Sequence, residues 1–233
     1  MINKLEKISV IMCSFNDEIS VDKSIQSIRN QTYDNLEILV LDDGSSDNTY
    51  NLLKSMEAKD SRIKIFKNEK NIGLTKSLNL LINNSSANLI ARHDADDESH
   101  PQRFEYQIDA IKNHNLDFCT TRSLKMRTLR KIPNLSYYAP SKILIKYKNP
   151  FIHGSLMIKK DVIKEIGSYD ENFYYAQDYK LFIDLIRKNY RYKVLRKPLY
   201  FLNMDNNIST NYRSEQAYYA YCARKKIKPE QNK

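Results

Sequence analysis

The stretch Leu36–Asp43, LEILVLDD, is followed at once by the turn residues GSSDNT at 44–49. A continuous apolar run this short predicts a strand that is buried on both faces, as strands of parallel sheets are. The glycine and the small polar residues after it end the strand. The sequence therefore predicts a central strand that presents two aspartates at its carboxyl end.

The same signals recur on both sides of this stretch. Apolar runs predict further strands at 7–15, 62–68 and 88–94, and apolar residues at helical spacing predict helices at 17–32, 49–59 and 73–85. Alternating strands and helices predict a mostly parallel sheet with helices on both faces, an α/β fold. After Pro101 the pattern is less regular. It predicts helices at 103–115, 160–167 and 176–190, strands at 154–159 and 192–202, and a helix after Asn211.

Composition agrees with one soluble globular domain. The chain has 233 residues, of which 41% are hydrophobic and 28% charged. No signal-peptide pattern and no long apolar run are seen, so we expect a cytoplasmic protein. The three cysteines, Cys13, Cys119 and Cys222, lie far apart and form no CxxC pair, which fits a reducing compartment and structural roles.

The net charge of +10 is unevenly distributed. No acidic residue occurs between Asp117 and Asp161, a span that holds ten lysines and arginines. Such a span attracts phosphate, anionic lipid, acidic polymer or nucleic acid, or is simply a solvated surface. No nucleic-acid recognition motif accompanies it, and we expect no nucleic-acid partner. The hypothesis we keep is that this span meets an anionic acceptor or the lipid headgroups that carry it.

Polar clusters directly follow three of the predicted strands: Ser14 to Asn16, Asp42 to Gly44, and Asp94 to Asp97. Because ligands of open α/β sheets sit at the carboxyl ends of the strands, these clusters predict one binding site at that edge.

The aspartates of HDADD allow three interpretations. The spacing from Asp94 to Glu105 resembles a calcium-binding EF-hand loop, but Ser99 stands where that loop needs glycine. Asp96 or Asp97 could instead cap the helix that begins near Pro101, although Ser99 can do so alone. The third interpretation, which we favour, is Mg²⁺ or Mn²⁺ held on a phosphorylated ligand. Neither a Walker loop nor a GxGxxG fingerprint is present.

Seven motifs in order give the chain a family resemblance. They are SVIMCSFND, LEILVLDDGSSDNT, NIGLTKSLN, IARHDADDESHPQRFEYQ, NPFIHGSLMIKK, IGSYDENFYYAQDYKLF and PLYFLNMDNNIST. Over Ile8–Ser209 the chain resembles the inverting glycosyltransferases of family 2. The resemblance implies the GT-A fold, a Rossmann-like nucleotide-binding sheet with a smaller acceptor-side portion. We expect this domain to span 1–212, with a nucleotide-sugar half (1–100) and an acceptor half (101–212), followed by a basic tail (213–233).

The resemblance also implies roles for particular residues. Asp178 matches the catalytic base, which takes the proton of the acceptor hydroxyl. Asp96 and Asp97 would hold the metal ion, Mn²⁺ or Mg²⁺. On the acceptor side we place His153 and Gln177, with a structural hydrogen bond equally open for His153. The nucleotide-binding residues would be Ser14, Asn16, Glu18, Asp43, Lys76 and Asp94, with Asp42 and Gly73 beside them.

The implied activity is the metal-dependent transfer of a hexosyl or N-acetylhexosaminyl group, with inversion, from a nucleotide-sugar donor. We expect a UDP-linked donor, a saccharide or lipid-linked acceptor, and a role in bacterial polysaccharide, lipopolysaccharide or capsule synthesis at the inner face of the membrane. Two departures from the family pattern are notable. Leu202 and Met204 replace an Arg-x-His pair, for which Asn203, Asp205 or Arg213 could substitute, and Cys13 replaces a proline. The first departure motivates an alternative function, a nucleotide-sugar-binding protein of the same fold with weakened catalysis.

Overall fold

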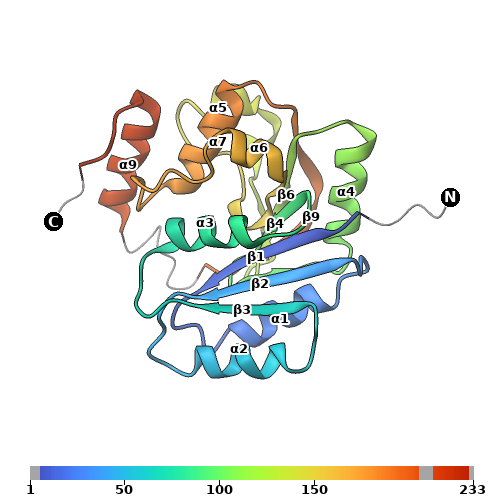
Figure 1. Cartoon of the computed structure of the whole chain (residues 1–233). Coiled ribbons are helices and arrows are strands. Elements are labelled where there is room, and N and C mark those ends of the chain that lie inside the picture. Colours follow the sequence, from blue (N-terminus) through green and yellow to red (C-terminus); the bar gives the residue numbers. More distant parts are fainter. Residues whose placement is uncertain (1–5, 205–211, 231–233) are drawn as a thin grey trace.

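The computed structural model describes residues 6–204 and 212–230. It contains one mixed sheet with the strand order β3-β2-β1-β4-β8-β6-β9-β5, and β7 pairs with β6 at the side of this path. Helices cover both faces of the sheet (Figure 1). The predicted α/β class is therefore confirmed.

The first half of the chain forms the parallel part of the sheet. β1 (Ile8–Ser14) lies between β2 (Leu36–Asp42) and β4 (Leu89–Arg92), and β3 (Ile63–Lys67) pairs with β2; all three pairings are parallel. α1 (Val21–Arg29) and α2 (Thr49–Glu57) lie on one face, and α3 (Leu74–Asn84) lies on the other (Figure 1). The strand–helix alternation predicted for this half is confirmed element by element.

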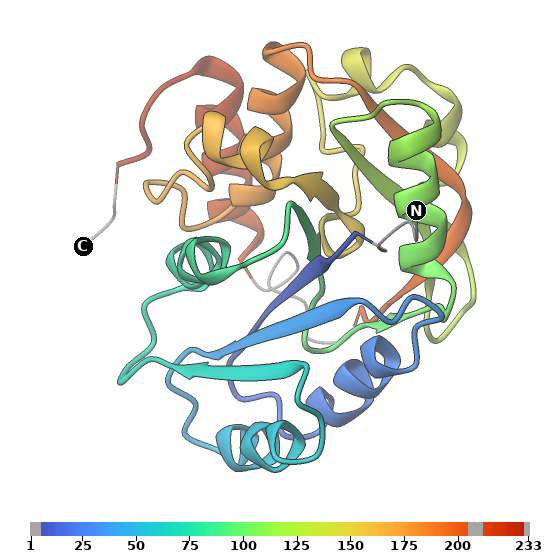
Figure 2. The same ribbon diagram turned by 45° about the vertical axis from the view of Figure 1, so that its right-hand side comes forward.

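The second half continues the sheet with mixed pairing. β8 (Met157–Lys159) runs antiparallel to β4 and to β6 (Phe118–Lys125), and β9 (Tyr192–Leu202) runs parallel to β6. Figure 2 shows the long β9 strand crossing this half beside α4. The short strands are β5 (Glu98–Ser99) and β7 (Lys131–Ile132), and the helices are α4 (Arg103–Asn113), α5 (Ser141–Leu144), α6 (Lys160–Glu165) and α7 (Gln177–Arg187).

One predicted boundary is corrected. The strand expected at 154–159 begins only at Met157, because His153–Ser155 form the 3-10 helix η2. A second 3-10 helix, η1, spans Leu135–Tyr138. The prediction for 192–202 matches β9 residue for residue.

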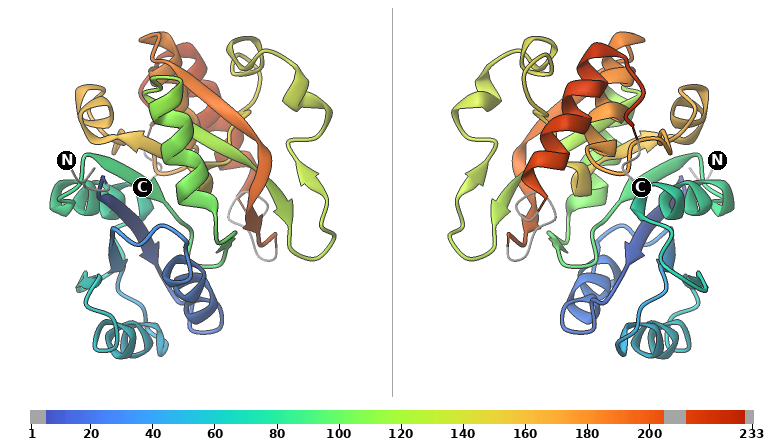
Figure 3. Two further views of the ribbon diagram at one scale, coloured as in Figure 1. Left: turned by 90° about the vertical axis from the view of Figure 1, so that its right-hand side faces the viewer. Right: turned by 90° about the vertical axis from the view of Figure 1, so that its left-hand side faces the viewer.

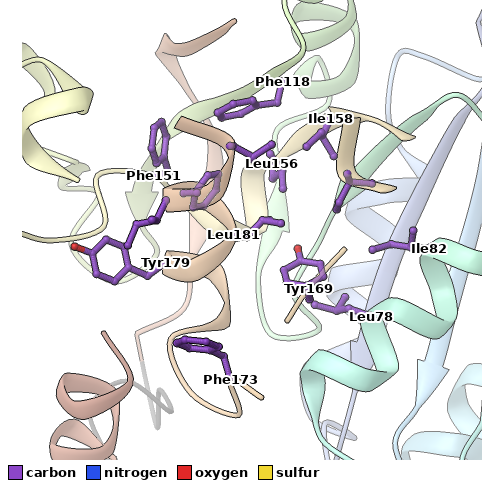
Figure 4. Close-up of a cluster of buried hydrophobic side chains, with 14 of the residues drawn as sticks. Leu78, Ile82, Phe118, Phe151, Leu156, Ile158, Tyr169, Phe173, Tyr179 and Leu181 are labelled. Carbon is purple, nitrogen blue, oxygen red and sulfur yellow. The ribbon is translucent and has the colours of Figure 1, made fainter. Parts of the chain in front are cut away.

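Two apolar clusters, one on each face of the sheet, hold the fold together. On the face of α1, α2 and α4, β1 contributes Ile8, Val10 and Met12. On the opposite face, Ile11 and Ile90 pack with residues of α3, α6 and α7. Figure 4 shows this second cluster, in which Phe118, Phe151 and Leu181 lie between the sheet and α7. Strand alternation divides the side chains between the two clusters, which is why the strands read as unbroken apolar runs.

The C-terminal segment belongs to the same core. α9 (Arg213–Lys225) packs against α7 and buries Cys222 and Ala223 in the cluster on that face. The helix predicted after Asn211 is therefore confirmed. Cys119 and Cys222 are buried, Cys13 is partly buried, and all three are free thiols.

A buried carboxylate ties the start of the sheet together. Glu37, on β2, is 3% exposed and accepts hydrogen bonds from Ser9 Oγ, from the Ser86 amide and hydroxyl, and from Lys7 Nζ. Burial alone would raise the pKa of Glu37, but these hydrogen bonds outweigh it and lower the pKa to about 2.

We expect Glu37→Gln to destabilise the fold at neutral pH by about 3 kcal/mol. The folded-state pKa lies below the ordinary value of 4.5, so this stabilisation is complete above pH 4.5 and is lost as the pH falls toward 2. Urea unfolding of wild type and Glu37→Gln between pH 7 and pH 2 would measure this stabilisation and its loss. Asp109→Asn, an exposed change on α4, is the control. The prediction would be contradicted if the difference in free energy of unfolding between wild type and Glu37→Gln did not become smaller as the pH falls.

Candidate active site

The carboxyl ends of β1, β2 and β4 meet at one edge of the sheet. They end at Ser14, Asp42 and Arg92, and because the strands are parallel their following loops share this rim. Ser14 is buried and donates from its hydroxyl to Asp17 Oδ2 over 2.9 Å. The predicted clustering of the three polar stretches is what the fold produces.

Two of the predicted nucleotide contacts hold one loop to another. Asn16, which has a positive φ of 57°, accepts through Oδ1 from the Ser46 amide at 2.9 Å. Glu18 Oε2 accepts from the Asn48 amide at 2.9 Å. The β1–α1 loop is thus bound to the β2–α2 loop by two side chains that were predicted to contact the nucleotide.

The two aspartates at the end of β2 differ in their partners. Asp43 is 3% exposed and accepts from Asn68 Nδ2, the Ile72 amide and the Gly73 amide at 2.7, 3.0 and 2.9 Å. It therefore fixes the segment 68–73 that leads into α3. Asp42 is fully buried, and its Oδ1 has no hydrogen-bond partner among the described residues. Lys76 lies exposed in the first turn of α3, close after this segment.

The aspartate cluster follows β4. Asp94 is ion-paired with Arg92, and its amide donates to Tyr200 Oη at 3.0 Å. Asp97 is 2% exposed and accepts from the Asn203 amide at 2.7 Å. Burial, followed by the charges of Asp94 and Asp17, raises the pKa of Asp96 to about 6. The rim therefore concentrates negative charge that its own hydrogen bonds do not neutralise.

These donors fit a hard divalent cation. Among residues 6–204 and 212–230 no three His, Cys, Asp or Glu side chains are arranged to hold a metal ion alone. Mg²⁺ and Mn²⁺ suit oxygen ligands, and Mg²⁺ is commonly held by one or two carboxylates together with substrate phosphates. The raised pKa of Asp96 shows an uncompensated carboxylate of this kind. Asp205, expected as a substitute ligand, lies outside the described residues, and Arg213 begins α9.

Arg92 is a residue of this site that the sequence reasoning missed. Its side chain is fully buried and binds Asp94, while Nε and Nη1 have no partner among the described residues. Burial lowers the pKa of Arg92, but the Asp94 carboxylate reverses this and raises it above the ordinary value, so the guanidinium stays charged. The signal was available: a lone basic residue inside an apolar strand, NLIARHD, needs a carboxylate partner.

The predicted base, Asp178, lies in the first turn of α7. Asp178 Oδ2 accepts from Asn149 Nδ2 at 2.7 Å. Ala176, just before the helix, adopts a left-handed conformation with φ 51°, and its amide donates to Gln216 of α9 at 3.1 Å. Gln177 and Asp178 are both half-buried. The sharp entry into α7 thus fixes the direction in which these two side chains leave the helix.

Half-buried His153 and buried Tyr169 form a neutral pair on which charges of both the rim and the base act. His153 Nε2 and Tyr169 Oη are 2.7 Å apart. Burial, together with the charge of Arg92, lowers the pKa of His153 to about 4, and burial raises the pKa of Tyr169. The charges of Asp94 and Asp178 also act on both groups. Asp94 and Asp178 therefore both influence this pair electrostatically, which agrees with their predicted place in one site.

Gly154 allows the elements of this site to meet. A side-chain carbon here would collide with the Tyr200 hydroxyl and the Asp94 carboxylate. Tyr200 is fully buried and cannot move aside. We expect Gly154→Ala to lower the free energy of unfolding by about 1–3 kcal/mol and to disturb the position of Asp94.

Thermal unfolding and nucleotide binding would test this. Gly167→Ala is the control, because nothing lies within 4 Å of the added carbon and only the φ of 91° is strained there. Equal effects of the two substitutions on nucleotide binding would contradict a steric role for Gly154.

The fold, with acidic residues at the carboxyl ends of its parallel strands, agrees with the glycosyltransferase class that the sequence motifs predicted. The chain belongs to glycosyl transferase family 2, whose sequence profile matches residues 9–167. An uncharacterised glycosyltransferase of Haemophilus influenzae is 31% identical over 96% of this chain and 72% of its own length. The Escherichia coli enzyme named UDP-Glc:alpha-D-GlcNAc-diphosphoundecaprenol beta-1,3-glucosyltransferase, WfgD, is 40% identical over 48% of this chain and 43% of its own.

Solved structures share the fold. Mannosyltransferase PcManGT of Pyrobaculum calidifontis, in complex with GDP-Man and Mn²⁺, superposes with a TM-score of 0.78 at 14% identity, covering 99% of this chain and 67% of its own. Staphylococcus aureus TarS 1-349, in complex with UDP-GlcNAc, gives 0.76 at 19% identity, covering 88% and 61%. The chain thus spans about three fifths of that TarS fragment. No helix within the described ranges is long and apolar enough to cross a membrane.

Proposed function

We propose that this protein transfers a sugar from a UDP-linked donor to a lipid-linked saccharide acceptor, with inversion at the anomeric carbon. The observation that carries the proposal is the position of Asp178. Asp178 lies at the start of α7, and the charges of both Asp178 and Asp94 act on His153 and Tyr169, so the two carboxylates share one electrostatic environment. A single displacement requires a base for the acceptor proton and a group, such as a bound cation, that stabilises the departing diphosphate.

On the donor side, the proposed contacts come from the rim. Asp43 would read the base with help from the fixed segment 68–73. Ser14, Asn16 and Glu18 would contact the nucleotide, and Lys76 would lie near the diphosphate. Asp42, buried with one unpartnered oxygen, is a further acceptor for a donor group of the nucleotide. Asp96, with Asp97 and Asp94, would hold Mn²⁺ or Mg²⁺, which offsets the charge that develops on the departing diphosphate.

On the acceptor side, Asp178 removes the proton. The acceptor oxygen forms its bond to the anomeric carbon while the bond from that carbon to the diphosphate oxygen breaks. The released proton rests on Asp178, so charge and atoms balance. Asn149 orients the carboxylate through its 2.7 Å hydrogen bond. Because burial keeps His153 neutral at pH 7, it is suited to orient a sugar or acceptor hydroxyl, with Gln177 beside the base.

The similar proteins support two parts of this proposal, the UDP-linked donor and the lipid-linked acceptor. TarS was solved with UDP-GlcNAc, and the name of WfgD specifies UDP-Glc and a diphosphoundecaprenol-linked acceptor. On this basis we assign the protein to bacterial polysaccharide, lipopolysaccharide or capsule synthesis at the cytoplasmic face of the membrane. PcManGT, which has the same fold, was solved with GDP-Man. Whether the donor of this protein carries UDP or GDP must therefore be tested directly.

The test is hydrolysis of a panel of donors, UDP-Glc, UDP-GlcNAc, UDP-Gal and GDP-Man, with Mn²⁺ or EDTA, alongside calorimetric binding of UDP. Slow, metal-dependent hydrolysis of one UDP-sugar, lost in Asp178→Asn, supports the proposal and names the sugar. UDP binding without turnover on any donor or acceptor would favour the nucleotide-sugar-binding alternative. Failure to bind UDP would overturn the UDP assignment.

A further inference from the structure

The segment 134–148, which contains η1 and α5, carries exposed apolar side chains on a basic surface. Leu135, Tyr138, Ile143 and Tyr147 are exposed by 80, 71, 55 and 74%. Apolar groups are usually scattered singly on a soluble protein, so four in one short segment indicate a contact surface. Figure 3 shows this segment, in yellow-green, at the outer edge of the molecule and far from α1 and α2.

Local structure orients these side chains in pairs. Leu135 and Tyr138 stand three residues apart in a 3-10 helix, where such residues lie on the same side. Ile143 and Tyr147 stand four apart in the helical turns that continue from α5 through Lys148. Between them, Ile145 turns inward and is 6% exposed. The segment is therefore amphipathic and anchored on one side only.

The surrounding charge is of one sign. Lys142, Lys146 and Lys148 are exposed, and none of the three has an ion pair with a carboxylate of the described residues. Two other basic residues of the acid-free span have structural partners: Arg122 packs over Tyr137, and Lys159 pairs with Asp117. Three exposed lysines without such an ion pair thus lie beside the exposed apolar groups.

We propose that the segment 134–148 is the surface by which this protein binds an anionic lipid bilayer. Tyrosine and aliphatic side chains with neighbouring lysines match the interface of such a bilayer, where the rings and methyl groups enter the headgroup layer and the lysines meet the phosphates. Membrane binding itself does not depend on the proposed function. Only its suggested purpose, to bring the active site to a lipid-linked acceptor, rests on that function.

The segment also lies directly beside the proposed base. The carbonyl of Ile145 accepts a hydrogen bond from the Tyr179 hydroxyl of α7. Asn149, one residue past the segment, donates to Asp178. A bilayer bound at 134–148 would therefore present lipid-linked acceptors on the Asp178 side of the site and leave the nucleotide rim open to solution.

The experiment is co-sedimentation of the full chain, without substrates, with vesicles of phosphatidylglycerol and phosphatidylcholine in equal parts, and with phosphatidylcholine alone. Wild type should bind the anionic vesicles only. The variant Lys142→Gln/Lys146→Gln/Lys148→Gln should bind about a hundredfold more weakly, because each lysine contributes roughly a fivefold attraction. The variant Leu135→Ser/Ile143→Ser should bind about tenfold more weakly or worse.

The matched control is Lys23→Gln/Lys59→Gln/Lys64→Gln. It makes the same change of net charge with exposed lysines of the nucleotide half and should bind as wild type does. Thermal unfolding of each variant checks the fold. Equal losses in the control and the segment variants would overturn the proposal, as would unchanged binding of the apolar variant, or binding of acidic polysaccharide without vesicle binding. Donor hydrolysis is measured separately, so failure of the proposed function and failure of membrane binding are distinguishable.

Discussion

Asp178→Asn is expected to lower kcat by about 10³-fold, within the 10²–10⁴ range of general base catalysis, while donor binding is retained. The amide has the shape of the carboxylate but cannot accept the acceptor proton. Asp178 is half-buried at the first turn of α7, with Asn149 at 2.7 Å. The substitution therefore removes a base and leaves the surrounding packing in place.

Steady-state transfer kinetics, with UDP affinity measured by calorimetry, would check this. The control is Asp184→Asn on the same helix, where the carboxylate pairs with Lys180 near the surface. Such surface pairs contribute about 0–1 kcal/mol, so this variant should transfer sugar at the wild-type rate. Wild-type kcat in Asp178→Asn would exclude Asp178 as the base and move attention to another group of the acceptor side.

Asp96→Asn is expected to remove the effect of Mn²⁺ on donor binding and to lower kcat/KM by about 10²- to 10³-fold, because a metal ion contributes several kcal/mol to stabilising a leaving diphosphate. Burial and the neighbouring carboxylates Asp94 and Asp17 make Asp96 an uncompensated acceptor. Replacing it by an amide reduces the negative charge that attracts the cation.

Titration of the protein with Mn²⁺, and of the protein with UDP in Mn²⁺ or EDTA, measures this directly. Asp109→Asn, an exposed change on α4, should respond to the metal as wild type does. If EDTA weakens UDP binding equally in wild type and Asp96→Asn, then Asp96 is not a ligand, and Asp97 or Asp94 would be tested next. If EDTA has no effect on wild type, the site works without a divalent ion.

The sequence was most informative where local pattern decides structure. The apolar runs of β1 to β4 and the intervening helices were predicted because period and length separate strand from helix. The gathering of Ser14, Asp42 and Asp94 at one edge followed from parallel pairing alone. β9 was predicted over its whole length even though Lys193, Arg196 and Lys197 interrupt its apolar residues.

What the pattern could not provide depends on contacts between distant residues. The order β4-β8-β6-β9 rests on pairings that no periodicity encodes. The hydrogen bonds by which Asn16 and Glu18 hold two loops together were not predicted, because their partners, Ser46 and Asn48, lie some thirty residues away in the chain. Gly154 reads as an ordinary glycine until Tyr200 and Asp94 are placed against it. Arg92 carried a signal in the sequence, a lone basic residue in an apolar strand, but its full burial and its pairing with Asp94 appear only in the structure.

The links from Asn16 and Glu18 to the second loop, and from Asp43 to the segment 68–73, have a consequence for the thermodynamics of donor binding. These loops are already ordered in the free protein, so the chain loses little conformational entropy when the nucleotide arrives. The amides of Ser46, Asn48, Ile72 and Gly73 should accordingly exchange slowly with solvent deuterium before any ligand is added. Nucleotide affinity can then be changed by altering single side chains, because the backbone that carries them is held in place by the fold.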